Sequence, residues 1–219
     1  MKRSDIDKVY EILEDAYQNM EEPSVTKISK QTKRDPFRVL VSCLISLRTK
    51  DEVTLVSSER LFAEADNPRK MLSFTEEQVA KLIYPAGFYK TKARTIKNIC
   101  EILINEYDGK VPEEIDELVK LKGVGRKTAN LVVVEGYARP AVCVDTHVHR
   151  IFNRLGYVKT KTPDKTELEL RKYLPEKYWI RINEILVAYG RSVCKPVSPI
   201  CSSCGLASLC DKVGVTVRR

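Results

Sequence analysis

Residues 121–127 read Leu-Lys-Gly-Val-Gly-Arg-Lys, and stretches of helical pattern lie on both sides, at 113–119 and 128–134. The two glycines, Gly123 and Gly125, predict a tight turn, because glycine accepts positive φ and lets backbone N–H groups approach a ligand closely. Those amides and the positive end of the following helix dipole together form an anion site. A plain connection between two helices is the alternative, since such turns are common.

Lys127 falls at the start of the second helix of this pair. An ordinary lysine has a pKa near 10.4, so it is protonated at neutral pH and is no nucleophile. The helix dipole and burial against a ligand both favour the neutral amine. A neutral lysine attacks carbon centres such as C1′ of a sugar and forms a Schiff base. The position therefore predicts a nucleophile, with a solvated helix lysine as the alternative.

Residues 144–150 read Val-Asp-Thr-His-Val-His-Arg and precede another helical pattern. Asp145 has the position of an N-cap, and a capping carboxylate is held ionised and oriented. Such a carboxylate can stabilise the cationic sugar of glycosidic cleavage. His147 and His149 are the only histidines and do not share a helix face, which argues against a histidine metal site. We expect His147 to support the site of Asp145.

Four of the seven cysteines lie close together in the pattern Cys-x6-Cys-x2-Cys-x5-Cys, formed by Cys194, Cys201, Cys204 and Cys210. A structural zinc site more often uses two Cys-x2-Cys pairs, and an odd cysteine total fits a disulfide framework poorly. Four thiolates on a short loop suit an iron–sulfur cluster, with zinc as the alternative. The other three, Cys43, Cys100 and Cys143, sit among apolar residues and are expected to be buried.

The hairpin, Lys127, the Val-Asp-Thr-His segment and the cysteine spacing occur in this order, and together they resemble the endonuclease III family of DNA glycosylases. The resemblance extends from about residue 10 to Cys210. It implies that Lys127 is the nucleophile of a combined glycosylase and abasic-site lyase, that Asp145 is the essential carboxylate, and that the four cysteines hold one 4Fe-4S cluster. It also implies that the hairpin amides hold a DNA phosphate, with a monovalent cation. The residues expected to contact DNA are Gly123, Val124, Gly125, Arg126, Thr128, Arg48, Phe88 and Lys195.

Three positions depart from the family pattern. Lys122 stands where the family usually has proline, and it adds a positive charge beside the phosphate path. Arg48 replaces the glutamine that enters the duplex in place of the damaged base, and arginine can fill the same gap by planar stacking. Phe88 stands where the family has an aliphatic wedge, so it is expected to enter between base steps, with an ordinary buried phenylalanine as the alternative.

The chain of 219 residues carries a formal net charge of +8, which suits a polyanionic partner. No apolar stretch is long enough to span a bilayer. The lack of such a stretch predicts no membrane association. The resemblance implies a monomer that binds double-stranded DNA with damaged bases or abasic sites, in the cytoplasm of a prokaryote at its nucleoid or in a eukaryotic nucleus. Other basic residues recur in two runs, and most of them are expected to lie on solvated helix faces: Lys27, Lys30, Lys33 and Arg34, then Lys90, Lys92, Arg94 and Lys97.

Helical periodicity runs through almost the whole chain, which predicts an all-α fold. An amphipathic helix is expected at 9–17 and a centrally buried helix at 37–47, with further helices near 76–83, 92–107, 165–173 and 180–189. The resemblance implies a two-lobed helix-hairpin-helix glycosylase fold. A helical barrel domain is expected at 29–139, ending in the hairpin, and an iron–sulfur domain at 1–28 plus 140–219.

The predicted function is base excision repair, by removal of oxidised pyrimidines and β-elimination at the abasic site through a lysine Schiff base. Lys127 favours this substrate class, because the adenine-mismatch and thymine-mismatch branches of the family lack a lysine there. Two alternatives are a mismatch or oxidised-purine glycosylase of the same superfamily, and a DNA-binding redox sensor without catalysis.

Overall fold

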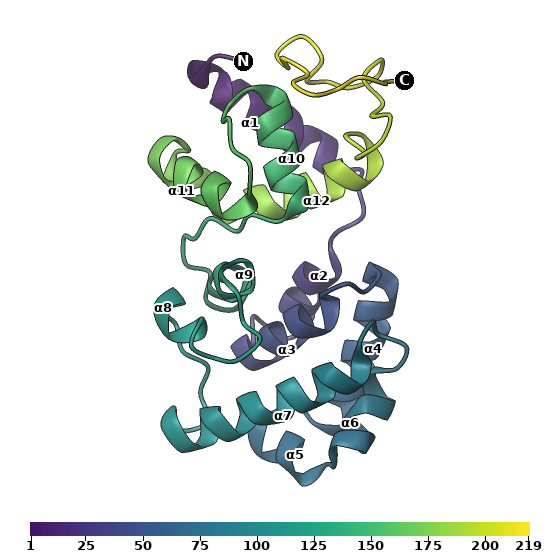
Figure 1. Ribbon diagram of the computed structural model, residues 1–219, viewed down its shortest axis with the longest axis vertical. Coiled ribbons are helices and arrows are strands. Elements are labelled where there is room, and N and C mark those ends of the chain that lie inside the picture. The colour runs from purple at the N-terminus through teal and green to yellow at the C-terminus, as the bar shows by residue number, and fades with distance from the viewer. The chain divides into compact units, whose positions relative to one another are not determined.

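All the regular secondary structure of the protein is helical, and the computed structural model describes all residues from 1 to 219 (Figure 1). It contains twelve α-helices, two short 3-10 helices and no strand, so the predicted all-α fold is confirmed. None of the helices combines the length and the apolar character that a membrane crossing requires.

The chain forms two units, each with its own core. Unit 1 consists of residues 1–23 and 142–219, and unit 2 of residues 24–141. The predicted boundary after residue 28 falls inside α2 (Ser24–Gln31). This helix belongs wholly to unit 2, where it packs against α3, α4 and α9.

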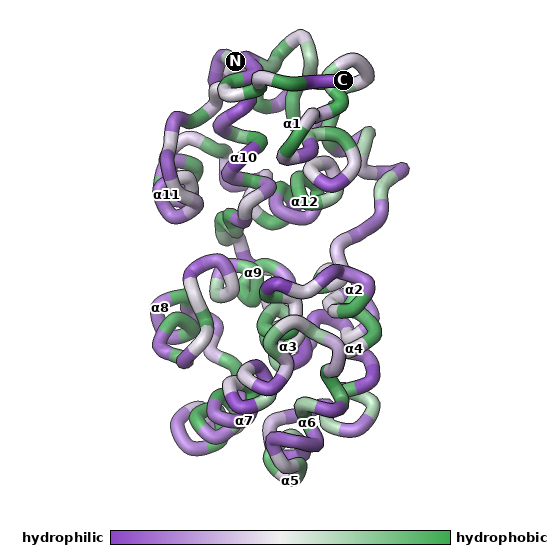
Figure 2. The backbone as a smooth tube through the Cα atoms, turned by 45° about the vertical axis from the view of Figure 1, so that its right-hand side comes forward, coloured by the Kyte–Doolittle hydropathy of each residue, from purple (hydrophilic) through white to green (hydrophobic).

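Unit 2 is built around a single buried helix. The helices around it are α2, α4 (Asp51–Glu64), α5 (Pro68–Ser73), α6 (Glu76–Ile83), α7 (Tyr89–Glu106), α8 (Ile115–Leu118) and α9 (Arg126–Tyr137). The central helix, α3 (Pro36–Ser46), buries nearly every side chain from Phe37 to Ile45. It packs against α2, α4, α7 and α9, and its hydrophobic sequence stands out in Figure 2. The expected central helix is therefore confirmed.

Periodicity alone did not indicate three of these helices, α2, α4 and α5. The reason is clearest in α4, which buries Thr54, Ser57 and Ser58 together with Leu61 and Phe62. Small hydroxyl side chains permit close helix packing, but they count as polar in a search for an apolar stripe. The sequence of α4 therefore carries little amphipathic signal although one side of the helix is buried.

Unit 1 joins the two ends of the chain. It contains α1 (Ile6–Tyr17), α10 (Thr146–Leu155), α11 (Pro163–Tyr173) and α12 (Ile182–Ser192), with short 3-10 helices at Arg3–Asp5 and Glu176–Tyr178. The N-terminal ammonium contacts Asp211, and both termini lie at one end of this unit (Figure 1). Its apolar core continues to Leu206, between the cysteines, so the cysteine segment is packed onto the core.

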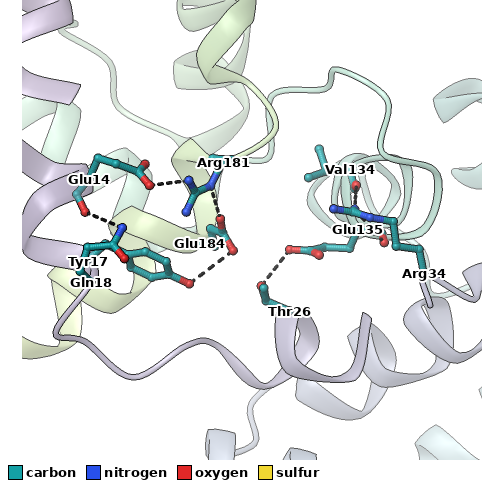
Figure 3. A network of polar contacts seen from close by, with 9 residues as sticks. All are labelled: Glu14, Tyr17, Gln18, Thr26, Arg34, Val134, Glu135, Arg181 and Glu184. Atoms are coloured by element: carbon teal, nitrogen blue, oxygen red, sulfur yellow. Dashed lines mark hydrogen bonds and ion pairs between the residues drawn. The ribbon is translucent and has the colours of Figure 1, made fainter. Parts of the chain in front are cut away.

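A polar network joins α1 to α12 inside unit 1. The Arg181 guanidinium contacts Glu14 and also donates to Glu184 at 2.8 Å, while the Tyr17 hydroxyl donates to Glu184 at 3.3 Å (Figure 3). Burial and the nearby Glu184 carboxylate raise the pKa of Tyr17. The N-terminal helix is thus tied to a unit whose remaining sequence lies more than a hundred residues away.

Candidate functional site

The predicted hairpin is present between α8 and α9, and its two glycines have different roles. Gly123 has φ +94°, a backbone conformation that favours glycine. Gly125 has φ −89° and ψ 172°, an extended conformation open to any residue, and it forms the N-cap of α9. Val124 between them is buried, and its amide donates to the Leu121 carbonyl at 2.9 Å. Only Gly123 needs positive φ, which corrects the expectation for the pair.

Substitution by alanine should destabilise the protein at Gly123 and have little effect at Gly125. A Cβ at Gly123 would lie 2.7 Å from Thr95 Cγ2, whereas a Cβ at Gly125 meets nothing within 4 Å. We expect Gly123→Ala to lower the free energy of unfolding by about 1–2 kcal/mol and to weaken DNA binding. Gly125→Ala should keep the melting temperature of the native chain. Calorimetry on both variants checks this, and equal melting temperatures would contradict it.

Lys127 is the second residue of α9 and is half-buried. The other end of this helix is held by side chains from α2 and the segment after it (Figure 3). Thr26 Oγ1 donates to Glu135 Oε1 at 2.8 Å, and Ser29 Oγ donates to the Glu135 carbonyl at 2.7 Å. Arg34 donates to the Val134 carbonyl at 3.1 Å. These contacts and the packing on α3 fix the helix axis, and therefore the position from which the lysine extends.

The electrostatic setting of Lys127 combines a helix N-terminus with a buried thiol. The helix dipole opposes a positive charge in the first turn of α9. The Cys43 thiol of α3 is fully buried, and burial raises its pKa to about 12, while the charge of Lys127 acts in the opposite direction. Cys43 is therefore a neutral neighbour of the lysine rather than a counter-ion. Cys100 and Cys143 are also fully buried, as predicted.

Asp145 caps α10, as its position in the sequence indicated. Its Oδ1 accepts hydrogen bonds from the backbone amides of His147 and Val148, both at 2.9 Å. The carboxylate is half-buried, so one oxygen is held by the helix while the group still borders solvent. Asp145 lies in unit 1 and Lys127 in unit 2.

The two histidine side chains lie in different surroundings. His147 contributes its backbone amide to Asp145, while its ring Nδ1 lies 3.1 Å from Arg150 Nη2. Arg150 in turn donates to the carbonyls of Gly190 and Cys194, at 3.0 and 2.9 Å. A Cβ at Gly190 would lie 2.3 Å from His147 Nδ1, so glycine is required there. The ring of His147 is thus packed between α10 and α12.

His149 predicts a pH dependence of stability. Its Nδ1 lies 2.7 Å from Thr166 Oγ1, and burial lowers its pKa below the usual 6.5. The unfolded chain therefore takes up a proton at a higher pH than the folded chain. The stability from this group is present above pH 6.5 and is lost as the pH falls through the folded-state pKa. We expect His149→Gln to flatten the fall in melting temperature between pH 7 and 5, and an unchanged slope would contradict this.

Arg48 and Phe88 lie beside each other in unit 2, on two different loops. Both have left-handed backbone conformations, with φ +52° and +57°, and the Arg48 guanidinium carbon lies 5.6 Å from the centre of the Phe88 ring. Phe88 is 64% exposed, so the alternative of an ordinary buried phenylalanine is wrong. A cavity of about 400 Å³ is lined by both residues and by Gly123 of the hairpin. Three DNA-contact candidates that are far apart in the sequence thus surround one cavity.

The four clustered cysteines follow α12 and line one pocket with apolar walls that include Val193, Ile200 and Val215. Two N–H donors and one hydroxyl lie within hydrogen-bond distance of three of the sulfurs. Arg154 Nη1 donates to Cys194 Sγ at 3.4 Å, the Tyr189 hydroxyl lies 3.1 Å from Cys204 Sγ, and the Lys212 amide donates to Cys210 Sγ at 3.3 Å. Such donors suit thiolates that carry negative charge, so the donor chemistry fits an iron–sulfur cluster. No three His, Cys, Asp or Glu side chains gather closely enough to hold a single metal ion.

Lys195 lies directly after the first cysteine of the cluster, and it is half-buried. Arg154 donates to the Lys195 carbonyl and to the Pro196 carbonyl, both at 2.7 Å. One arginine thus holds the backbone of this loop and also contacts Cys194 Sγ. Sequence reasoning missed Arg154, because an arginine inside an amphipathic helix gives no local signal of a contact 40 residues away.

Comparison with known proteins assigns the class. Residues 41–176 match the model of the HhH-GPD superfamily of base excision DNA repair proteins. The chain is 49% identical over 177 residues to endonuclease III of Thermotoga maritima, covering 81% of this chain and 83% of that protein. The chain therefore belongs to the endonuclease III family, and it is a DNA glycosylase and abasic-site lyase of base excision repair.

Solved structures agree with this assignment. An endonuclease III in a non-covalent complex with DNA superposes with a TM-score of 0.86, at 32% identity, over 97% of this chain and 96% of that one. A trapped covalent endonuclease III–DNA intermediate superposes with a TM-score of 0.84, at 31% identity, over 97% of both chains. Relatives from plants, mammals and a bird are longer, and the chain spans 48% to 63% of their length.

Proposed function

We propose that the protein removes oxidised pyrimidines from double-stranded DNA and then cleaves the strand at the abasic site through a Schiff base on Lys127. The observation that carries this proposal is a lysine in the first turn of α9, directly after the hairpin. The helix dipole at this position favours the neutral, nucleophilic amine. The covalent DNA intermediate trapped for a related endonuclease III supports the same type of chemistry.

In the proposed reaction the damaged nucleotide is extruded from the duplex, because its reactive carbon is inaccessible in the stack. Arg48 and Phe88 fill the gap, and both are exposed on one cavity of unit 2. The Lys127 amine attacks C1′ while Asp145 stabilises the positive charge on the sugar, and the base leaves with its electron pair. The amine nitrogen then gives up a proton, the C1′–O4′ bond opens and O4′ takes up a proton, which leaves a Schiff base on C1′. The Schiff base acidifies the C2′ proton, and removal of that proton breaks the C3′–O bond, so that the 3′ phosphate leaves by β-elimination.

The remaining contacts are assigned to binding. The hairpin residues Gly123, Val124, Gly125, Arg126 and Thr128 are proposed to hold a DNA phosphate, with a monovalent cation at the turn. Lys195 is proposed as a second phosphate contact, on a loop whose backbone is held by Arg154. In this assignment unit 2 is the helical barrel domain and unit 1 the iron–sulfur domain, and the protein acts as a monomer.

We also propose that Cys194, Cys201, Cys204 and Cys210 hold one 4Fe-4S cluster. Support comes from the pocket that they share and from the two N–H donors and the Tyr189 hydroxyl beside their sulfurs. When bound, the cluster supplies a rigid centre for the loop that carries Lys195, and the base-removal chemistry stays with Lys127 and Asp145. Iron analysis should give about four irons per chain with a broad brown absorbance. Stoichiometric zinc without iron would overturn this assignment.

A panel of four duplexes tests the substrate class. They contain thymine glycol, uracil opposite guanine, adenine opposite 8-oxoguanine, and 8-oxoguanine opposite cytosine. We expect the fastest strand cleavage on thymine glycol, together with a complex that borohydride reduces to a covalent product. Fastest release of adenine without strand cleavage would identify a mismatch enzyme instead and overturn the proposal.

A further inference from the structure

Lys92 is a buried lysine in the first turn of α7, four residues after Phe88. It is only 7% exposed, so it is an exception among the basic residues that were mostly expected on solvated helix faces. Its Nζ donates to three oxygens: the Ile45 carbonyl at 2.7 Å, the Leu47 carbonyl at 2.6 Å, and Thr49 Oγ1 at 2.8 Å. A buried amine with three acceptors ties together the segments that carry them, and its loss removes one donor from each acceptor.

The three acceptors surround the loop that carries Arg48. Ile45 and Leu47 lie at the C-terminal end of α3, where carbonyls lack partners within the helix and where a positive charge is favourable. Thr49 lies on the other side of Arg48. The backbone of Arg48 is left-handed, a conformation that costs a non-glycine residue free energy and persists only where its surroundings hold it. Lys92 therefore holds this loop by hydrogen bonds on both sides of Arg48.

The hydrogen bonds of Lys92 also connect, through Thr49, to the loop that carries Phe88. Thr49 Oγ1 accepts a hydrogen bond from the Gly87 amide at 3.0 Å, so one hydroxyl serves both Lys92 and Gly87. The two loops are in close contact here, because a Cβ at Gly87 would lie 2.3 Å from the Arg48 carbonyl oxygen. Phe88 follows directly, also with left-handed backbone.

We propose that Lys92 is a positioning residue that locks the Arg48 and Phe88 loops together in the geometry that opens a DNA duplex. It acts through its grip on Thr49 and the α3 carbonyls, and its amine has no part in bond cleavage. This inference rests on the proposed function, in which Arg48 and Phe88 fill the gap left by the extruded nucleotide. The advantage is preorganisation, since two exposed side chains on strained loops then enter DNA without first being ordered.

The proposal predicts an effect confined to duplex DNA. Borohydride trapping rates are compared on an abasic site in a duplex and on the same oligonucleotide in single-stranded form, where no gap needs filling. For Lys92→Met, which keeps an unbranched side chain one atom shorter and removes the donors, we expect the duplex rate to fall about tenfold or more. The single-strand rate should remain within about twofold. Fluorescence of 2-aminopurine opposite the abasic site should show less unstacking.

Two further variants keep the test decisive if Lys92→Met folds poorly. Thr49→Val removes the shared hydroxyl and should give the same duplex-specific loss, whereas Thr49→Ser keeps it and should behave as the native chain. Lys97→Met is the matched control, because Lys97 also lies on α7 and donates to backbone carbonyls, those of Leu72 and Phe74, at a different loop. It should leave the ratio of duplex to single-strand rates unchanged.

The outcomes distinguish failure of the role proposed for Lys92 from failure of the proposed function. Equal losses on duplex and single-stranded DNA, or no loss for both Lys92→Met and Thr49→Val, would overturn the role of Lys92 while trapping by the native chain upholds the proposed function. Absence of trapping by the native chain on every substrate would overturn the proposed function itself.

Discussion

Replacement of Lys127 by alanine is expected to abolish the covalent complex that borohydride traps on abasic-site DNA, and to lower strand cleavage by on the order of 10⁴-fold or more. The reason is that the Schiff base requires this amine, and the rest of the hairpin binds DNA without supplying a nucleophile. Folding should be little affected, because Lys127 lies in the first turn of a helix that is anchored at its other end by Thr26, Ser29 and Arg34. Denaturing gels after reduction, with calorimetry on the same sample, measure both effects.

Two neighbours supply the controls for this variant. Lys122 and Arg126 lie on the same hairpin and are exposed. Lys122→Ala and Arg126→Ala should keep the trapped complex and weaken DNA binding, with a salt dependence lowered by roughly one phosphate contact each. A trapped complex of normal yield in Lys127→Ala would show that another amine is the nucleophile.

The second large effect is expected for Asp145→Asn. Asparagine caps a helix about as well as aspartate, so the hydrogen bonds to the His147 and Val148 amides can remain. The negative charge is lost, and we expect base excision to fall by about 10²- to 10³-fold while the melting temperature changes little. Asp145→Ala removes charge and cap together, and it should additionally lower the free energy of unfolding by about 1 kcal/mol. Single-turnover base release and calorimetry separate these two contributions.

Asp35 offers a matched control within the same chain. It caps α3 with the same type of bond, accepting from the Arg38 amide at 2.9 Å, and it belongs to no proposed active site. Asp35→Asn should therefore leave base excision unchanged. If Asp35→Asn lowers the rate as much as Asp145→Asn does, the loss reflects stability in general rather than charge at the sugar.

Much of the fold was predictable because its signals are local. The hairpin, the N-cap at Asp145 and the buried α3 each depend on residues within a few positions of one another, so the sequence displays them directly. α4 was not predictable in the same way, because Thr54, Ser57 and Ser58 are buried by contacts with other helices. Residue type alone does not reveal that a hydroxyl side chain faces a packed neighbour.

The candidate site likewise has features that the sequence predicted and features that only the structure revealed. The order of the hairpin, Lys127, Asp145 and the cysteines determined the family, because catalysis and metal binding require particular residue types at particular spacings. The exposure of Phe88 was open in the sequence, and the structure decided it. Arg154, whose contacts hold the Lys195 loop, was found only in the structure.

The hairpin segment, residues 121–127, has some properties that the sequence determines and others that depend on the tertiary structure. The sequence by itself determined that a turn with two glycines precedes a helix with a lysine in its first turn, since these are properties of adjacent residues. Only the tertiary structure decided that Gly123 alone needs positive φ and that the Thr95 side chain occupies the space where a Cβ on Gly123 would lie. The burial of Lys92 was also decided by the tertiary structure. The physical reason is that burial and strain depend on which distant segments fill the surrounding space. The carbonyls that hold Lys92 belong to Ile45 and Leu47, which lie 47 and 45 positions earlier in the chain.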